Sequence, residues 1–266
     1  MSEHQYISSL QNPKVKQLLL LQQKSSERRK AGLFVVEGER ELRHCLNAGY
    51  EMDSVFLCPS LHPTPNTHHP TPNTHVYEVS PQVYEKIAYR GSTEGIVAVI
   101  KSKTLHLEDL QWPENPLIVV LESVEKPGNL GAVLRTADAA GADAVVVCDA
   151  LTDLYNPNLI RASIGALFTV PVVSMSSEAC IAFLKEHGIR ILTAQLQDSE
   201  LYYDTDMRHG TAIVMGTEST GLTNCWREAA DAHIRIPMCG RLDSLNVSVS
   251  AAILLFEAVR QRMERR

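Results

Sequence analysis

Apolar residues follow one pattern in the first hundred residues of the chain and another after residue 117. Short apolar runs at residues 33–36, 54–57, 76–79 and 95–100 predict strands, while helical spacing at residues 15–22 and 81–87 predicts helices. The polar residues at 37–40 open a further helical segment. Strands that alternate with helices over this length predict a compact α/β domain.

From residue 117 the apolar runs are continuous, at residues 117–121, 144–148, 170–173, 189–192 and 212–215. Continuous runs are typical of a parallel sheet that is covered on both faces, whereas a half-exposed sheet gives alternating runs. In such sheets ligands bind at the carboxyl ends of the strands. We therefore expect the functional residues in the loops that follow these runs.

Two polar segments interrupt the apolar pattern. Residues 101–116 (KSKTLHLEDLQWPENP) contain two prolines and predict a linker, so we expect an N-terminal domain at 1–105, a linker at 106–116 and a C-terminal domain at 117–266. Residues 62–75 repeat HPTPNTH in tandem and predict an exposed loop, because proline disfavours both ladder and helix. A surface insertion explains its histidines better than a metal site, since no carboxylate or thiolate lies near, and we expect no metal.

Composition is that of an ordinary globular protein, with 44% hydrophobic and 21% charged residues among 266. No apolar run approaches the roughly 20 residues of a membrane span, and the start MSEHQYISSL lacks the pattern of a secretory signal. A cytoplasmic location is the resulting expectation. The six cysteines contain no C-x-x-C pair and predict reduced, mostly buried thiols.

The formal net charge of −6 excludes a protein that coats nucleic acid through bulk electrostatics, so any RNA site must be a local basic patch. Two patches qualify. The first lies within residues 14–30 and the second at the C-terminus; their basic residues are Lys14, Lys16, Lys24, Arg28, Arg29 and Lys30, and Arg260, Arg262, Arg265 and Arg266. A solvated helix face is the alternative interpretation of each.

The first segment with a chemical signal is NLGAVLRTA at residues 129–137. Asn129 is suited to cap a helix that runs to Ala140 and ends at Gly141. Arg135 falls in the second turn of this helix among small and apolar residues. A guanidinium in such surroundings is usually paired or bound to an anion, so Arg135 is the first candidate functional residue.

Two later segments also carry candidate functional residues. The G-x-G-x-x-G and P-loop patterns of nucleotide-binding proteins are both absent. Residues 216–222 (GTESTGL) place two glycines around Glu218, which lets the backbone approach a ligand; an ordinary turn beside a helix N-terminus is the alternative. Residues 236–248 (IPMCGRLDSLNVS) lead into an amphipathic helix. One face of that helix carries Val249, Ala252, Ile253, Phe256 and Val259.

Taken together and in this order, the three segments resemble the motifs of the SpoU (TrmH-like) family of RNA ribose 2'-O-methyltransferases, within the SPOUT superfamily. Residues 34–38 (FVVEG) and 95–99 (GIVAV) resemble the family's L30e-like substrate-binding domain. The implied fold class is α/β: a SPOUT-type trefoil-knot domain with a mostly parallel sheet covered on both faces, preceded by a smaller L30e-like domain. Thr217 departs from the family, which often has asparagine there, and the tandem repeat falls in a loop of the RNA-binding domain.

The resemblance implies S-adenosylmethionine as cofactor, held by backbone groups at Gly216, Ile236 and Leu245 with Ala194 and Met238 nearby. It also implies a homodimer whose site is completed across the interface. The RNA substrate is expected to be ribosomal RNA, with transfer RNA as the alternative. A non-catalytic RNA-binding module is a second hypothesis. An unrelated α/β enzyme that uses a nucleotide has little support without a phosphate loop.

Arg135 matches the family's catalytic arginine by position. A guanidinium is a poor general base, so we expect Arg135 to bind the adjacent phosphate and stabilise the developing alkoxide, and to act as a base only if its site depresses its pKa. The resemblance implies further residues that orient the ribose, the phosphate or Arg135. These are Asn129, Glu218, Ser244 and Asn246.

Overall fold

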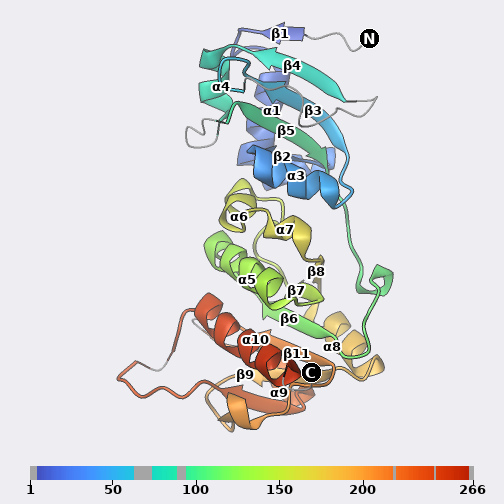
Figure 1. Cartoon of the computed structure of the whole chain (residues 1–266), viewed down its shortest axis with the longest axis vertical. Coiled ribbons are helices and arrows are strands. Elements are labelled where there is room, and N and C mark those ends of the chain that lie inside the picture. Colours follow the sequence, from blue (N-terminus) through green and yellow to red (C-terminus); the bar gives the residue numbers. More distant parts are fainter. Residues whose placement is uncertain (1–4, 63–73, 89–93, 218–219, 243, 264–266) are drawn as a thin grey trace. The chain divides into compact units, whose positions relative to one another are not determined.

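The computed structural model describes residues 5–62, 74–88, 94–217, 220–242 and 244–263 of a mixed α/β protein (Figure 1). Contacts divide the chain into two compact units. The first comprises Met1–Lys103 and Asp153–Thr169, and the second comprises Thr104–Thr152 and Val170–Arg266. The chain thus returns to the first unit once. The domain boundaries expected from the sequence stay a prediction.

The first unit contains a five-stranded sheet in the order β1-β4-β3-β5-β2. Strand β5 runs antiparallel to both of its neighbours, and the remaining pairs are parallel. The apolar runs predicted four of these strands, and the short edge strand β1 had no signal. The strands are β1 (Gln5–Ile7), β2 (Leu33–Glu37), β3 (Met52–Leu57), β4 (His75–Val79) and β5 (Ile96–Lys101).

Two helices of this unit, α1 and α4, begin with strong local signals. Asn12 caps α1 by accepting a hydrogen bond from the Lys14 amide, and Pro13 takes the first helical position. Ser80 caps α4 through the amide of Val83 in the same way. The helices are α1 (Pro13–Gln23), α2 (Ser25–Ala31), α3 (Glu39–Asn47), α4 (Pro81–Ile87), α6 (Pro157–Ala162) and α7 (Ala166–Thr169).

Strand β2 separates two packing layers because successive side chains point to opposite faces. Val35 joins the core cluster that contains Val15 and Leu18 of α1. Phe34, one residue earlier, stacks on Tyr155 with ring centroids 4.2 Å apart. The segment 153–169 therefore covers the face of the sheet opposite α1.

The second unit contains a seven-stranded sheet in the order β10-β12-β9-β11-β6-β7-β8, in which every described pairing is parallel. All six residues of β6 are buried, which confirms that both faces are covered. The predicted runs lie in or beside these strands, with β8 and β9 displaced toward the C-terminus. The strands are β6 (Leu117–Glu122), β7 (Ala144–Cys148), β8 (Val172–Met175), β9 (Arg190–Ala194), β10 (Glu200–Leu201), β11 (Thr211–Met215) and β12 (Ala232–Arg235).

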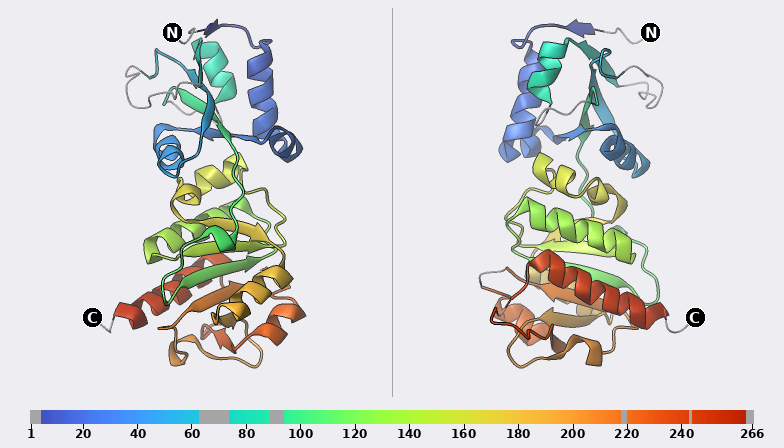
Figure 2. Two further views of the ribbon diagram at one scale, coloured as in Figure 1. Left: turned by 90° about the vertical axis from the view of Figure 1, so that its right-hand side faces the viewer. Right: turned by 60° about the vertical axis from the view of Figure 1, so that its left-hand side comes forward.

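Helices cover this sheet in two groups, with α10 packed along α5 and α8 packed against α9 (Figures 1 and 2). The predicted linker contains a 3₁₀ turn whose Leu107 is completely buried in the core of the unit. The elements are η1 (Leu107–Asp109), α5 (Pro127–Ala140), α8 (Ser177–Glu186), η2 (Tyr202–Asp204), α9 (Asn224–Ala229) and α10 (Val247–Met263). None of the helices in the described residues is long and apolar enough to cross a membrane.

The prediction that Asn129 caps α5 is wrong. The helix begins at Pro127 with Lys126 as its N-cap, so Asn129 lies inside the first turn. Proline suits the first helical position because its missing N–H is not needed there. The predicted end is confirmed, since Gly141 closes the helix with a left-handed φ of 65°.

The apolar face that the sequence predicts on α10 points away from the core. Val249 and Phe256 are 47% and 49% exposed, and Met263, one heptad further, is 65% exposed. The buried face instead carries Val247, Ala251, Leu254, Leu255, Ala258 and Gln261. Because this helix is apolar on both sides, its sequence period alone does not determine which side meets the sheet.

Candidate functional site

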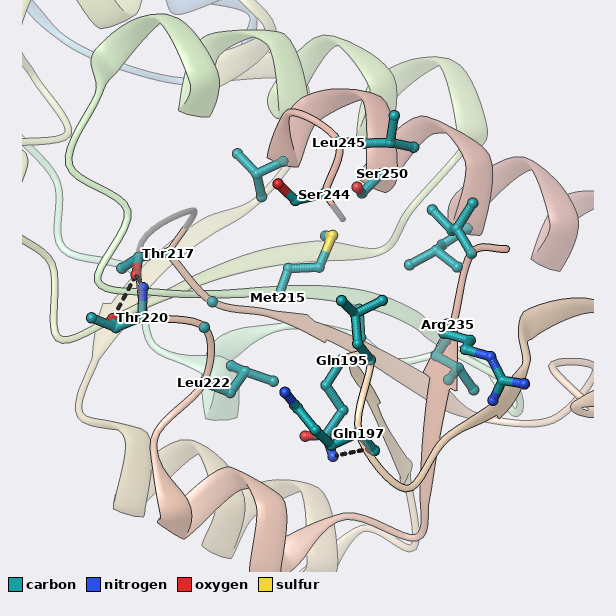
Figure 3. Close-up of a pocket in the computed structure, with 18 of the residues that line it drawn as sticks. Gln195, Gln197, Met215, Thr217, Thr220, Leu222, Arg235, Ser244, Leu245 and Ser250 are labelled. Atoms are coloured by element: carbon teal, nitrogen blue, oxygen red, sulfur yellow. Dashed lines mark hydrogen bonds between the residues drawn. The ribbon is translucent and has the colours of Figure 1, made fainter. Parts of the chain in front are cut away.

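A cavity of about 370 Å³ opens at the carboxyl ends of β9, β11 and β12 (Figure 3). It is lined by the loops that follow these three strands and by the start of α10. Five residues that the resemblance assigns to the cofactor line it together with Ser244; they are Ala194, Gly216, Ile236, Met238 and Leu245. The structure thus brings together residues from three separate segments of the chain. Their role as cofactor ligands stays a prediction.

The loop after β11 forms one wall of the cavity and folds tightly on itself. A side chain at Gly216 would place its Cβ only 2.3 Å from the carbonyl carbon of Gly221. The Gly221 amide donates to the Thr217 carbonyl at 3.1 Å, and the Thr217 hydroxyl accepts from the Thr220 amide at 3.0 Å (Figure 3). Gly216 is therefore needed for close approach of the chain to itself, where the sequence suggested approach to a ligand. Glu218 lies outside the described residues.

A second cavity, of about 240 Å³, adjoins the first through shared residues Gly216, Thr217 and Val247. Asn129 lines it, and the Nδ2 of Asn246 donates to the Oδ1 of Asn129 at 3.1 Å. Two predicted site residues, 117 positions apart in the chain, are thus joined directly. The Oδ1 of Asn246 also accepts from the Ser248 amide at 3.0 Å, which is the pattern of a helix N-cap for α10.

Arg135 lies apart from both cavities on the exposed side of α5. It is six residues beyond Asn129, a spacing that turns the two side chains about 120° apart on a helix. Within the described part of the chain, no side chain forms a hydrogen bond or ion pair with Arg135. Its guanidinium is therefore available for a group that comes from outside this chain.

The sequence did not single out several residues of the larger cavity, among them Gln195, Gln197, Arg227, Arg235 and Ser250. Gln195 and Gln197 directly follow β9, so the rule that ligands bind at strand ends could have found them. The Nε2 of Gln195 donates to the Gln197 carbonyl at 3.0 Å (Figure 3). Its Oε1 is buried and has no hydrogen-bond donor among the described residues. Buried polar atoms are normally satisfied, so this oxygen is a candidate acceptor for a ligand.

The two basic patches differ in what they leave exposed. Arg28 is buried and pairs with Asp153 at 2.6 Å, so it belongs to the interior. Near the C-terminus Arg260 pairs with Glu257, while the Arg262 guanidinium donates to backbone carbonyls such as that of Asn115 at 2.8 Å. Arg265 and Arg266 lie outside the described residues. The exposed basic side chains that remain are on α1, α2 and the residue between them: Lys14, Lys16, Lys24, Arg29 and Lys30.

The histidine-rich repeat falls largely on residues 63–73, outside the described part of the chain. Within the described part, no group of three or more histidine, cysteine or carboxylate side chains is placed to hold a metal ion. All six cysteines are free thiols and four are buried, which confirms the prediction made from their spacing.

The fold and the cavities define an α/β protein with a ligand site at the carboxyl edge of a parallel sheet. The chain belongs to the SpoU rRNA Methylase family, whose model matches residues 116–256. The model of the MRM3-like substrate binding domain matches residues 12–98. The two models match this chain in the order that the sequence motifs predict, with the substrate binding domain first.

Individual relatives agree with the family assignment. The 23S rRNA (guanosine-2'-O-)-methyltransferase RlmB of Vibrio cholerae is 37% identical over 195 residues, which cover 71% of this chain and 79% of that protein. The crystal structure of an RNA 2'-O ribose methyltransferase has 37% identity and a TM-score of 0.81, covering 97% of this chain and 99% of that one. The crystal structure of an AdoMet-bound rRNA methyltransferase from Sinorhizobium meliloti has 29% identity and a TM-score of 0.86, covering 96% of this chain and 97% of that one.

Proposed function

We propose that this protein transfers a methyl group from S-adenosylmethionine to a ribose 2'-hydroxyl of ribosomal RNA. The observation that carries the proposal is the convergence of Ser244 and the five predicted cofactor residues on one cavity. Beside that cavity, the Asn129–Asn246 pair supplies polar groups where an RNA backbone would meet the cofactor. Membership of the SpoU family and relatives that modify 23S rRNA support the same activity.

The larger cavity fits S-adenosylmethionine in size and chemistry. Its volume of about 370 Å³ is within the range of small-molecule sites. Leu222, Ile234 and Leu254 provide apolar walls for a base, and the unsatisfied Oε1 of Gln195 provides an acceptor. When bound, the cofactor supplies an electrophilic methyl group on a sulfonium. The chain's own contribution is to hold the ribose oxygen in line with that methyl, which can lower the barrier by several kcal/mol.

We assign to Arg135 the binding of the RNA phosphate and stabilisation of the alkoxide that develops on the 2'-oxygen. Asn129, Glu218, Ser244 and Asn246 orient the ribose, the phosphate or Arg135. Because Arg135 lies outside the cavities of its own chain, the proposal requires Arg135 to come from the partner subunit of a homodimer. The exposed apolar stripe of Val249, Phe256 and Met263 on α10 supports such an interface.

The first unit is proposed to grip the RNA. Its match to a substrate binding domain and the exposed basic side chains of α1 and α2 support this role. Phosphate contacts of this kind position a nucleic acid and do not read its sequence. The cytoplasmic location expected from the sequence is part of the same proposal.

The test measures methyl transfer to unmodified ribosomal RNA and to unmodified transfer RNA, with 2'-O-methyls mapped afterwards. Arg135→Ala should reduce turnover on ribosomal RNA at least about 100-fold, the usual cost of removing a group that stabilises developing charge. The turnover of Arg135→Lys should fall between those of Arg135→Ala and wild type, since lysine keeps the positive charge but loses the forked geometry of the guanidinium. Arg208→Ala, an exposed arginine away from both cavities, is the matched control.

Three outcomes would contradict parts of the proposal. Near-normal turnover of both Arg135 variants would exclude a catalytic role for this arginine. Methylation of transfer RNA alone would identify transfer RNA, and not ribosomal RNA, as the substrate. Failure of the folded protein to bind S-adenosylhomocysteine in calorimetry would favour the non-catalytic RNA-binding module.

A further inference from the structure

The last residue of β6, Glu122, places a carboxylate inside the second unit with only 3% of the residue exposed. A buried carboxylate is costly unless hydrogen bonds satisfy it, so the position of such a group has a structural or functional cause. Within the described residues, its hydrogen-bond partners are Thr223 and Ser177, both neutral. Glu122 does not line either cavity.

Thr223 supplies the two short contacts of this carboxylate. Its amide donates to Oε2 at 2.8 Å and its hydroxyl donates to Oε1 at 2.6 Å. The hydroxyl of Ser177 lies at 3.4 Å, a much weaker contact. The same Ser177 hydroxyl is 2.6 Å from Asp149 Oδ2 and accepts from Trp226 Nε1 at 2.9 Å. Ser177 has a single proton, which the shorter contact to Asp149 takes, so Thr223 is the main partner of Glu122.

The position of Thr223 connects this carboxylate to the cofactor cavity. Thr223 is the N-cap residue of α9, yet its side chain makes no capping hydrogen bond to that helix. Its hydroxyl is committed to Glu122 instead. Thr223 directly follows Leu222, which lines the cavity and is 4% exposed. The loop at residues 216–222 therefore leaves β11 at one end and is held by Glu122 at the other.

The internal geometry of the loop makes this anchor important. Gly216 and Gly221 approach so closely that no side chain fits between them, and the Gly221 amide closes the loop on the Thr217 carbonyl. Gly221 is thus tied to Gly216 and Thr217 at the end of β11. Displacement of Thr223 would carry Gly221 and Leu222, and with them one wall of the cavity.

We propose that Glu122 is a positioning residue that fixes the loop at residues 216–222 by accepting hydrogen bonds from the amide and hydroxyl of Thr223. This inference rests on the proposed function, because it takes the larger cavity as the site of S-adenosylmethionine. Glu122 itself touches neither the cofactor nor the RNA. Its effect on methyl transfer passes through the shape of the loop.

The test compares two substitutions at Thr223 by calorimetry with S-adenosylhomocysteine. Thr223→Val keeps the shape and the amide but removes the hydroxyl, and should raise the Kd about tenfold, equivalent to about 1.4 kcal/mol. Thr223→Ser keeps the hydroxyl, and its Kd for S-adenosylhomocysteine should stay within about twofold of the wild-type value. Asp149→Asn changes the network on the side away from the loop and should also leave the Kd within about twofold.

Glu122→Ala removes the acceptors of both Thr223 groups and should weaken binding more than Thr223→Val, which keeps the contact of the Thr223 amide. Thermal unfolding without ligand establishes that each variant is folded. Wild-type affinity in a folded Thr223→Val or Glu122→Ala variant would overturn the proposal, as would equal weakening by Thr223→Ser and Thr223→Val. If wild type itself does not bind S-adenosylhomocysteine, the proposed function fails and not the anchoring of the loop.

Discussion

Burial decides what a reactive side chain does in this protein. Arg28 and Arg262 belong to basic patches in the sequence, but the first is buried against Asp153 and the second donates to backbone carbonyls. Burial also governs the thiols. It raises the pKa of Cys45 to about 12, partly opposed by Lys103. The hydrogen bond with Cys180, together with burial, raises the pKa of Cys148.

These thiols should therefore react very unequally with a disulfide reagent such as DTNB. At pH 8 the exposed Cys239 should react first and the half-buried Cys225 more slowly. A raised pKa means less thiolate at a given pH, so Cys45 and Cys148 should stay protected at pH 10, above the ordinary thiol pKa of about 8.5. Absorbance counts the thiols, Cys239→Ser should remove the fast phase, and rapid reaction of the buried thiols in folded protein would contradict the prediction.

At the level of elements, the segment 153–169 is part of the first unit although it follows strand β7 of the second in sequence. Phe34 stacks on Tyr155, whose hydroxyl donates to the Lys103 carbonyl at 2.6 Å. Burial raises the pKa of Tyr155. The ion pair of Arg28 and Asp153 adds a charged contact between this segment and α2.

Removing one partner of that ion pair should destabilise the fold more than removing both partners. Asp153→Ala leaves the Arg28 charge buried without its partner and should lower the free energy of unfolding by about 3 kcal/mol. The double variant Arg28→Met with Asp153→Ala should lose less free energy of unfolding, because no buried charge remains. Urea unfolding measures both, with the exposed Lys24→Ala as control. Equal losses in the single and double variants would show that the charge is solvated.

At the level of the whole molecule, the active site is expected to be complete only in a homodimer. Arg135 is turned away from Asn129 and lines neither cavity of its own chain. An exposed apolar stripe on α10 lies on a helix that packs along α5, the helix that carries Arg135. A homodimer would bury the stripe and bring an arginine to each cavity.

A mixing experiment tests this arrangement. Arg135→Ala lacks the arginine, and Gly216→Ala should lose the cofactor because its Cβ would collide with Gly221. Each variant should be inactive alone, and their equimolar mixture should recover about one quarter of wild-type activity, since half of the dimers are mixed and each has one complete site. Light scattering reports the oligomeric state. A monomeric wild type, or a mixture without recovery, would contradict a shared site.

Local signals in the sequence determined much of the architecture. Continuous apolar runs determined the parallel sheet, because a strand covered on both faces must be apolar throughout. Gly141 determined the end of α5, because only a residue that tolerates positive φ closes a helix in this way. The family resemblance carried by the three motifs also named in advance six of the residues that line the larger cavity: Ala194, Gly216, Ile236, Met238, Ser244 and Leu245.

Tertiary structure decided what depends on contacts between distant residues. Arg28 meets Asp153 across 125 positions, Thr223 meets Glu122 across 101, and no local pattern encodes either pair. The face of α10 that meets the core was also undetermined, since the helix is apolar on both sides. Local periodicity specifies that a residue is buried or helical, whereas its partner depends on how the chain folds back on itself.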